Sequence, residues 1–167
     1  VVDNRILISE TYEKGSVLLD FDGQNLTPIW ADTGVAKRQS FRAHWATPIY
    51  HEGALFGCSG RNEPDADLRC IDWTSSALRW VHRNRDRTNL LYVDGHFLVL
   101  GEHGSLHLLR ADSNQMMEVA SMDLGQLAAE DEQPLLESPT WAPPSLAHGI
   151  LYLRGRNRLV ALELIPR

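Results

Sequence analysis

The sequence predicts an all-β protein built from a repeated four-stranded unit. Apolar runs of about four to eight residues, rich in Val, Ile, Leu, Tyr and Trp, alternate with Gly, Asp, Asn and Pro, which is typical of strands joined by turns. Helical periodicity is nearly absent. A strand–turn–strand pattern also returns along the chain, and this predicts a β-propeller of four-stranded antiparallel blades.

The repeat is anchored on a hairpin turn. It occurs at residues 1–8 (truncated), 48–57, 90–99 and 144–153. The turn position is held by Asn4, Gly53, Gly95 and Gly149. Such a turn needs a residue with positive φ, which Gly and Asn tolerate best. The intervals are 53 − 4 = 49, 95 − 53 = 42 and 149 − 95 = 54 residues, close to the roughly 40–50 residues of one blade.

Each anchor is followed by further predicted strands. Third strands are expected at 17–20, 68–72, 106–109 and 159–163, and fourth strands at 28–30, 78–80 and 117–119. The blades then cover about residues 1–32, 45–83, 89–123 and 139–167 of a single propeller domain, the last without its outer strand. An open arc would expose apolar blade faces, so we expect the remaining blades of a seven- or eight-bladed ring in the same polypeptide. A four-bladed ring that closes on itself is the alternative.

Composition excludes several classes of protein. The 167 residues are 43% hydrophobic and 23% charged, which suits a folded globular domain, and no apolar run is long enough for a transmembrane helix. The net charge of −6 argues against a nucleic-acid partner. The chain begins at Val1 without an initiator Met or a signal-peptide pattern, so its N-terminus is expected to be cut.

Residues 68–80 carry a resemblance to a known repeat. Asp72 ends a predicted strand and Trp80 ends the next, and this spacing resembles the quinoprotein-type (PQQ-like) propeller repeat. Ser75 and Ser76 stand where that repeat usually has Thr and Gly. The resemblance implies that Trp80, and Trp30 in the first blade, dock between neighbouring blades. Similar proteins include quinone-dependent alcohol dehydrogenases and the BamB-type lipoprotein scaffold, which implies a bacterial, periplasmic or outer-membrane-associated protein.

Two functional classes follow from this resemblance. The favoured one is a non-catalytic, BamB-like binding scaffold that needs no cofactor. The alternative is part of a quinoprotein alcohol dehydrogenase that depends on PQQ and calcium. For that enzyme the resemblance implies adjacent cysteines, whereas Cys58 and Cys70 are separate. If they lie on neighbouring strands, they form either a cross-strand disulfide or two buried thiols.

Candidate contact residues lie in the predicted interblade loops, where propellers present binding groups on a rigid scaffold. They are Arg42, His44, Trp45, Arg61, Glu102, His103 and Trp141. The seven histidines show no metal-ligand spacing, and no triad or phosphate loop is present, so we predict no catalytic, metal or cofactor residue. The expected partner is a protein, a peptide or a polysaccharide.

Overall fold

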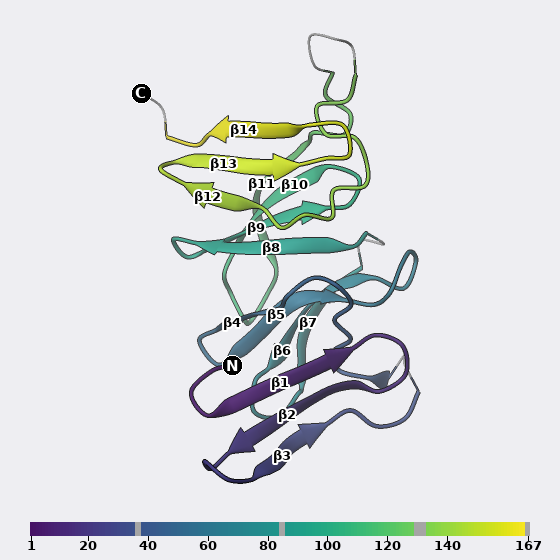
Figure 1. Cartoon of the computed structure of the whole chain (residues 1–167), viewed down its shortest axis with the longest axis vertical. Helices are drawn as coiled ribbons and strands as arrows, with labels where there is room; N and C mark the ends of the chain where they lie inside the picture. Colours follow the sequence, from purple (N-terminus) through teal and green to yellow (C-terminus); the bar gives the residue numbers. More distant parts are fainter. Residues whose placement is uncertain (36–37, 84–85, 129–132, 166–167) are drawn as a thin grey trace. The chain divides into compact units, whose positions relative to one another are not determined.

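The computed structural model describes residues 1–35, 38–83, 86–128 and 133–165, and the regular elements within them are β-strands (Figure 1). The first sheet contains β1 (Arg5–Glu10), β2 (Gly15–Phe21) and β3 (Leu26–Ala31). The second contains β4 (Ile49–His51), β5 (Ala54–Ser59), β6 (Asp67–Asp72) and β7 (Leu78–His82). The third contains β8 (Thr88–Val93), β9 (His96–Gly101), β10 (Ser105–Arg110) and β11 (Met117–Asp123). The fourth contains β12 (Ser145–Ala147), β13 (Ile150–Arg154) and β14 (Leu159–Glu163).

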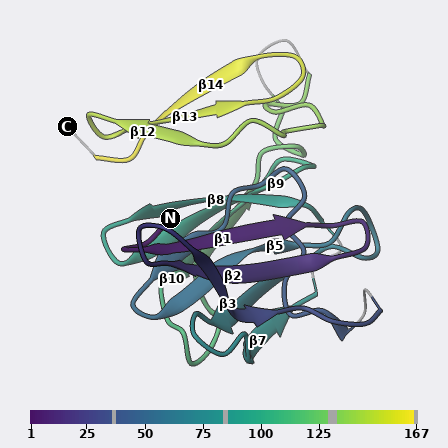
Figure 2. The same ribbon diagram turned by 60° about the horizontal axis from the view of Figure 1, so that its bottom comes forward.

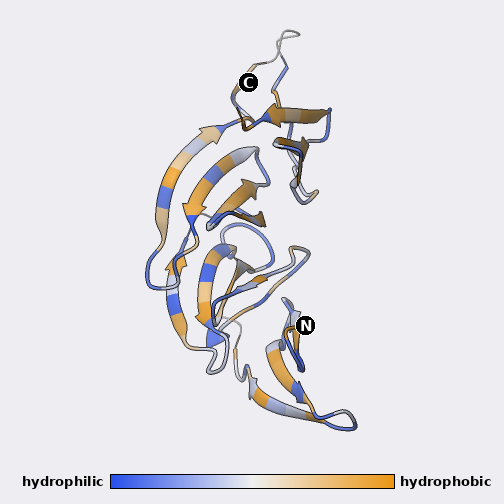
Figure 3. Ribbon diagram, turned by 90° about the vertical axis from the view of Figure 1, so that its left-hand side faces the viewer, coloured by the Kyte–Doolittle hydropathy of each residue, from blue (hydrophilic) through white to orange (hydrophobic). Residues whose placement is uncertain are grey.

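Every sheet is an antiparallel meander whose strands follow their order in the sequence (Figures 1 and 2). The chain divides into two compact units. Unit 1 comprises Val1–Arg87 and Ser113–Met116, and unit 2 comprises Thr88–Asp112 and Met117–Arg167. Hydrophobic and hydrophilic residues alternate along several strands (Figure 3), as strands with two different faces require. In the described ranges, no helix has the length and hydropathy needed to cross a bilayer.

The hairpin turns of the repeat use two left-handed residues. Gly53, Gly95 and Gly149 have φ of 76°, 72° and 76°. The residue before each glycine is also left-handed, at Glu52, Asp94 and His148 (φ 45°, 45° and 51°). This is the pattern of a type I′ turn, whose twist matches that of the strands it joins. In the first turn, the expectation for Asn4 was wrong, because the left-handed residue is Asp3 (φ 50°).

A β-bulge recurs on the outer strand and sets the position of the tryptophans. The register shifts after Leu18 in the first sheet, after Cys70 in the second and after Leu108 in the third. The residues opposite these three positions are Trp30, Trp80 and Ala120. The fourth strand predicted at 117–119 therefore ends one residue before the tryptophan position, because the bulge was not visible in the strand pattern.

Each unit has its own hydrophobic core. In unit 1, buried Leu18, Phe41, Leu55, Ile71 and Trp73 form one cluster. Trp30 packs against this cluster and its indole N–H donates a 2.8 Å hydrogen bond to the Trp73 carbonyl. Trp30 thereby joins the first sheet to the second. In unit 2, leucines of β9, β10 and β13 pack with Val160 of β14. Cys58 and Cys70 are both buried thiols, and they face Leu68 and Phe56 rather than each other.

Candidate functional site

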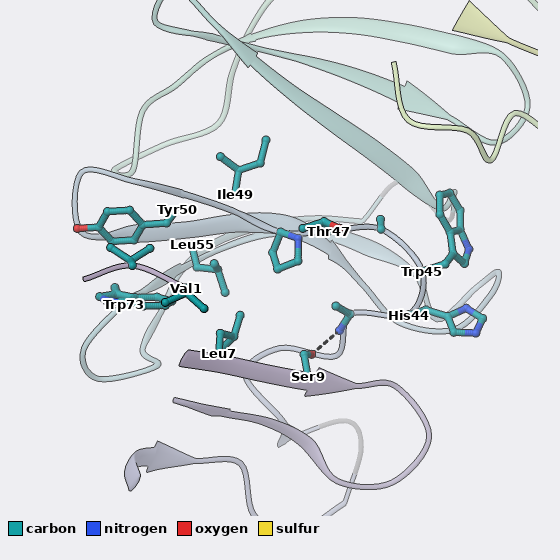
Figure 4. Close-up of a pocket in the computed structure, with 14 residues that line it drawn as sticks. Val1, Leu7, Ser9, His44, Trp45, Thr47, Ile49, Tyr50, Leu55 and Trp73 are labelled. Atoms are coloured by element: carbon teal, nitrogen blue, oxygen red, sulfur yellow. Dashed lines mark hydrogen bonds between the residues drawn. The ribbon is translucent and has the colours of Figure 1, made fainter. Parts of the chain in front are cut away.

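A groove lies in unit 1 between β1 and the segment 43–50 that leads into β4 (Figure 4). Its volume is about 590 Å³, within the range of small-molecule and peptide sites. The lining side chains are apolar in the middle, where Leu7 and Leu55 lie. Leu55 belongs to the buried core of unit 1 and Leu7 packs against it. The groove floor is therefore a rigid part of the core.

Aromatic rings stand at both ends of the groove. Figure 4 shows Tyr50 and Trp73 at one end and His44 and Trp45 at the other. The Tyr50 and Trp73 rings make an edge contact with centroids 5.1 Å apart. Trp45 packs against a small buried cluster of Ala46, Cys58 and Ala66. These contacts hold both ends in place, so the groove is preformed for an apolar or aromatic group.

Ser9 is one of the hydroxyl-bearing residues that line the groove, and its role is structural. Its Oγ accepts hydrogen bonds from the Ser16 hydroxyl (2.7 Å) and from the Ala43 backbone N–H (2.8 Å, dashed in Figure 4). Ser16 Oγ also lies 2.8 Å from the Phe41 carbonyl oxygen. Both serines are thus used to fasten the segment 41–43 to β1 and β2. This arrangement presents His44 and Trp45 beside the groove.

A cluster of exposed side chains, Tyr12, His44 and Arg61, continues from the His44 end of the groove. The Tyr12 and His44 rings meet edge to face at 5.8 Å, and the Tyr12 hydroxyl lies 3.5 Å from His44 Nε2. The Arg61 guanidinium lies 4.8 Å above the Tyr12 ring, within the range of a cation–π contact. Tyr12 is 59% exposed, so the cluster is open to a partner.

The loops that carry this cluster are ordered by carboxylates. Glu10 accepts hydrogen bonds from the backbone N–H groups of Tyr12 (2.7 Å), Glu13 (2.9 Å) and Lys14. These backbone donors, that of Lys14 foremost, lower the pKa of Glu10. Asp65 accepts from the Arg61 backbone N–H at 3.3 Å and pairs with the Arg42 guanidinium at 2.7 Å. The hydrogen bond from Arg42 is the main reason that the pKa of Asp65 is lowered.

Arg42 therefore supports the site rather than forming its surface. It is only 4% exposed, which contradicts its assignment to the contact face. Its Nε has no hydrogen-bond partner among the described residues. The Arg42 carbonyl accepts from the Gly60 N–H, which fixes the start of the loop that holds Arg61. Arg42, which was predicted to be a contact residue, therefore positions the loop that carries Arg61.

The predicted residues of unit 2 form a second polar group. Glu102 is 6% exposed, so it is likewise not a surface contact residue. Its carboxylate accepts a 3.1 Å hydrogen bond from the indole N–H of Trp141, and it lies 3.7 Å from His103 Nε2. His103 Nδ1 lies 3.1 Å from the Ser138 hydroxyl. Trp141 and His103 are exposed, so these two remain available for contacts.

The groove of unit 1 does not fit a calcium–quinone centre. Calcium in proteins prefers carboxylate and carbonyl oxygens. None of the described side chains that line the groove is a carboxylate. The two cysteines of the chain lie apart, buried in β5 and β6, so they do not form the adjacent pair that the resemblance implies for a quinoprotein dehydrogenase.

Comparison with solved structures identifies the fold. The chain is similar to a europium-containing methanol dehydrogenase, with a TM-score of 0.58 and 16% identity over 91% of this chain and 33% of that one. It is also similar to a chain of the S. cerevisiae assembly of Dbp5 with Nup159, Gle1, IP6 and ADP (TM-score 0.55, 12% identity, 90% and 36% coverage). A third similar structure is the computationally designed Ika8 protein (TM-score 0.56, 11% identity, 99% and 57% coverage).

The chain has a β-propeller fold. The four antiparallel sheets and the similarity to a propeller quinoprotein confirm the predicted fold class. The chain spans about a third of the first two similar structures and 57% of the third. No protein-family model matches the chain, and no curated protein matches it in sequence. The BamB-like scaffold role stays a prediction.

Sequence reasoning missed three residues of the site. Tyr12, Tyr50 and Trp73 were not among the candidates, although all three are aromatic and lie in or next to turns. Tyr50 was read only as part of a hairpin strand, and Trp73 only as part of the repeat. Tyr50 and Trp73 meet within the second sheet, whereas Tyr12 meets Arg61 only because the first sheet packs against the second. No local pattern encodes that packing.

Proposed function

We propose that this chain is a non-catalytic binding module that holds a protein segment in the groove of unit 1. The observation that supports it best is the groove itself, which has an apolar middle, aromatic rings at both ends and the exposed cluster of Tyr12, His44 and Arg61 beside it. Aromatic residues and arginine are the side chains that most often dominate binding energy at protein interfaces.

The chemistry of the groove favours a peptide over a polysaccharide. Its centre is formed by Leu7 and Leu55, which suit an aliphatic or aromatic side chain better than a sugar hydroxyl. The Arg61 guanidinium beside Tyr12 suits a carboxylate of the partner. The proposed ligand is therefore an extended segment with an apolar anchor and an acidic residue near it.

The test is selection of binders from a random peptide library on the 167-residue chain. Selected peptides should combine an aliphatic or aromatic residue with Asp or Glu. Tyr12→Ala and Arg61→Ala should each weaken binding about tenfold, as expected when a central contact is removed. Tyr92→Ala is the matched control, because Tyr92 is also an exposed tyrosine with an aromatic contact, but on β8 of unit 2.

Two results would contradict this proposal. Binding that is unaffected by both groove-side substitutions, with circular dichroism unchanged, would place the binding surface elsewhere. Selection of oligosaccharides but no peptides from matched arrays would replace the protein segment by a polysaccharide.

The second candidate is a fragment of a PQQ- and calcium-dependent alcohol dehydrogenase. It is supported by the similarity to the europium-containing methanol dehydrogenase, which concerns the fold. Any cofactor site would have to use residues outside the groove. Titration of the full-length protein with PQQ and calcium, with dye reduction as the activity readout, tests it: calcium-dependent binding with turnover would favour the dehydrogenase over the binding module.

A further inference from the structure

The third sheet lacks the tryptophan that the first two sheets have. In the first sheet, Leu7 pairs with Leu18 and Leu18 with Trp30. At the corresponding positions of the third sheet, Leu98 pairs with Leu108 and Leu108 with Ala120. The two leucines are thus retained, while an alanine replaces the indole.

A hollow lies at this position in unit 2. Its volume is about 190 Å³, and Leu98, Leu106, Leu108, Ala120, Ser121 and Met122 line it. Leu98 and Leu106 are buried members of the unit 2 core, and Leu108 packs against that core. The base of the hollow is therefore part of a well-packed core. Apart from Ser121, the lining residues are apolar. Met122 is 46% exposed at the edge, where a ligand could enter.

The size of the hollow suits an aromatic ring. An apolar cavity of about 150 Å³ accepts benzene, so a hollow of about 190 Å³ has room for a slightly larger planar group. The register indicates which group this is. In unit 1 the corresponding place is taken by the Trp30 indole, which packs on the same pair of leucine positions.

The repeat register assigns a hydrogen-bond acceptor to the matching position. The Trp73 carbonyl accepts the indole N–H of Trp30, and the Trp73 backbone N–H binds the carbonyl of the turn residue Gly53. In the fourth sheet, the Leu164 backbone N–H binds the carbonyl of the turn residue Gly149 in the same way. The Leu164 carbonyl is therefore the repeat equivalent of the Trp73 carbonyl.

We propose that the hollow over Ala120 binds a planar aromatic ring carrying an N–H donor, of which indole is the simplest. The ring lies on Leu98 and Leu108, and its N–H donates to the Leu164 carbonyl. Two sources share this chemistry: a free indole-type molecule and a tryptophan side chain of another polypeptide. This site is independent of the groove proposed in unit 1.

The experiment is titration of indole into the ¹³C-methyl-labelled 167-residue chain. We expect saturable shifts of the Leu98, Leu108 and Met122 methyl signals with a dissociation constant of roughly 1 mM, as befits a ligand of so few atoms. The Leu18 methyl signals of unit 1 should not move. Titration with 1-methylindole should give severalfold weaker binding, because it cannot donate to the Leu164 carbonyl.

Substitutions make the test specific. Ala120→Trp should abolish indole binding by filling the hollow with its own side chain, as Trp30 does in the first sheet. Val119→Trp is the matched control, because Val119 is half exposed and does not line the hollow. Should Ala120→Trp fail to fold, Met122→Lys places a charge at the edge and should weaken indole binding at least tenfold.

The outcomes distinguish a small-molecule ligand from a tryptophan side chain of another polypeptide, and one of them contradicts the proposal. Tighter binding of a tryptophan-containing peptide than of indole favours a polypeptide ligand, and the reverse order favours a small molecule. The proposal is overturned if the methyl signals of Leu98, Leu108 and Met122 show no saturable shift, or if Ala120→Trp binds indole as the unchanged chain does.

Discussion

Asp72 shows how one side chain can organise a turn. Its Oδ1 accepts hydrogen bonds from the backbone N–H and the hydroxyl of both Thr74 and Ser75, at 2.9–3.0 Å. Its Oδ2 pairs with the Arg79 guanidinium at 2.7 Å. These contacts, that with Arg79 foremost, lower the pKa of Asp72 well below its ordinary value. The carboxylate thus ties the end of β6 to the start of β7.

In the first sheet, a different residue organises the turn. Asp20 has the register position of Asp72, but there it only makes a 3.8 Å exposed ion pair with Arg5. The turn of that sheet, residues 22–25, is instead organised by Asp22, which accepts hydrogen bonds from the Gln24 and Asn25 backbone N–H groups. The sequence repeat identified Asp72 correctly. The hairpin of the first sheet has two more residues between Asp20 and Trp30 than the second has between Asp72 and Trp80, and this hid the corresponding turn residue, Asp22.

Asp72→Ala should lower the free energy of unfolding by about 1–3 kcal/mol, because the turn loses a charged acceptor that receives several hydrogen bonds. Asp20→Ala should change it by less than about 0.5 kcal/mol, since an exposed ion pair contributes little. Urea unfolding measures both. An equal loss in the two variants would contradict the structural difference between the turns.

Asp72→Asn should show a pH dependence with a definite sign. A carboxyl whose folded-state pKa is lowered contributes stability above its unfolded pKa, and this contribution disappears as the pH falls towards the folded pKa. The stability difference between the unchanged chain and Asp72→Asn should therefore be complete above about pH 5 and shrink below about pH 4. Urea unfolding at a series of pH values checks this. A difference that grows on acidification would contradict the assigned pKa direction.

At the scale of elements, the hairpin turns are the most regular feature of the chain. In all four of them a residue other than glycine has the first positive φ (Asp3, Glu52, Asp94 and His148), and of these Glu52 is poorly suited to it. Asn is the better residue there, because Asn-Gly is a preferred type I′ pair.

Glu52→Asn should therefore raise the free energy of unfolding by about 0.5–1 kcal/mol. Glu13→Asn is the control, since Glu13 is also exposed in a loop but has no positive φ. Thermal and urea unfolding should agree. No gain at Glu52, or an equal gain at Glu13, would show that the backbone conformation of the turn is not the cause.

The contact between the first and second sheets depends on Trp30. Trp30→Phe keeps an aromatic ring but removes the donor to the Trp73 carbonyl. We expect a loss of about 1–2 kcal/mol of unfolding free energy, from one partly buried hydrogen bond and some contact area. The near-ultraviolet circular dichroism of the indoles should change with it. Stability unchanged from the parent chain would mean that apolar packing alone joins the two sheets.

For the whole molecule, the open edge of β14 is the main feature. β14 is an edge strand of a three-stranded sheet, and Leu159 and Ile165 at and beyond its ends are 64% and 65% exposed. Exposed strand edges with apolar side chains promote association between chains. The sequence prediction of a missing outer strand agrees with this edge, since the fourth sheet has three strands and the second and third have four.

The 167-residue chain should therefore self-associate in a concentration-dependent way, and Leu159→Lys should reduce the association by placing a charge on the edge. Sedimentation velocity over a range of concentrations measures it. Lys14→Leu, an apolar substitution on an exposed loop of unit 1, is a control that should leave the β14-mediated association unchanged. A chain that stays monomeric at all concentrations would contradict the role of this edge.

The sequence by itself determined the β-propeller fold, because hairpin turns and strand alternation are local patterns that repeat at blade spacing. It also placed Trp30, Trp80 and Asp72 in their elements. Only the tertiary structure decided the site. Arg42 is buried behind it, Tyr12 and Arg61 meet across two loops, and Ala120 occupies the tryptophan position, because these facts depend on a bulge and on sheet packing that bring together residues far apart in the chain.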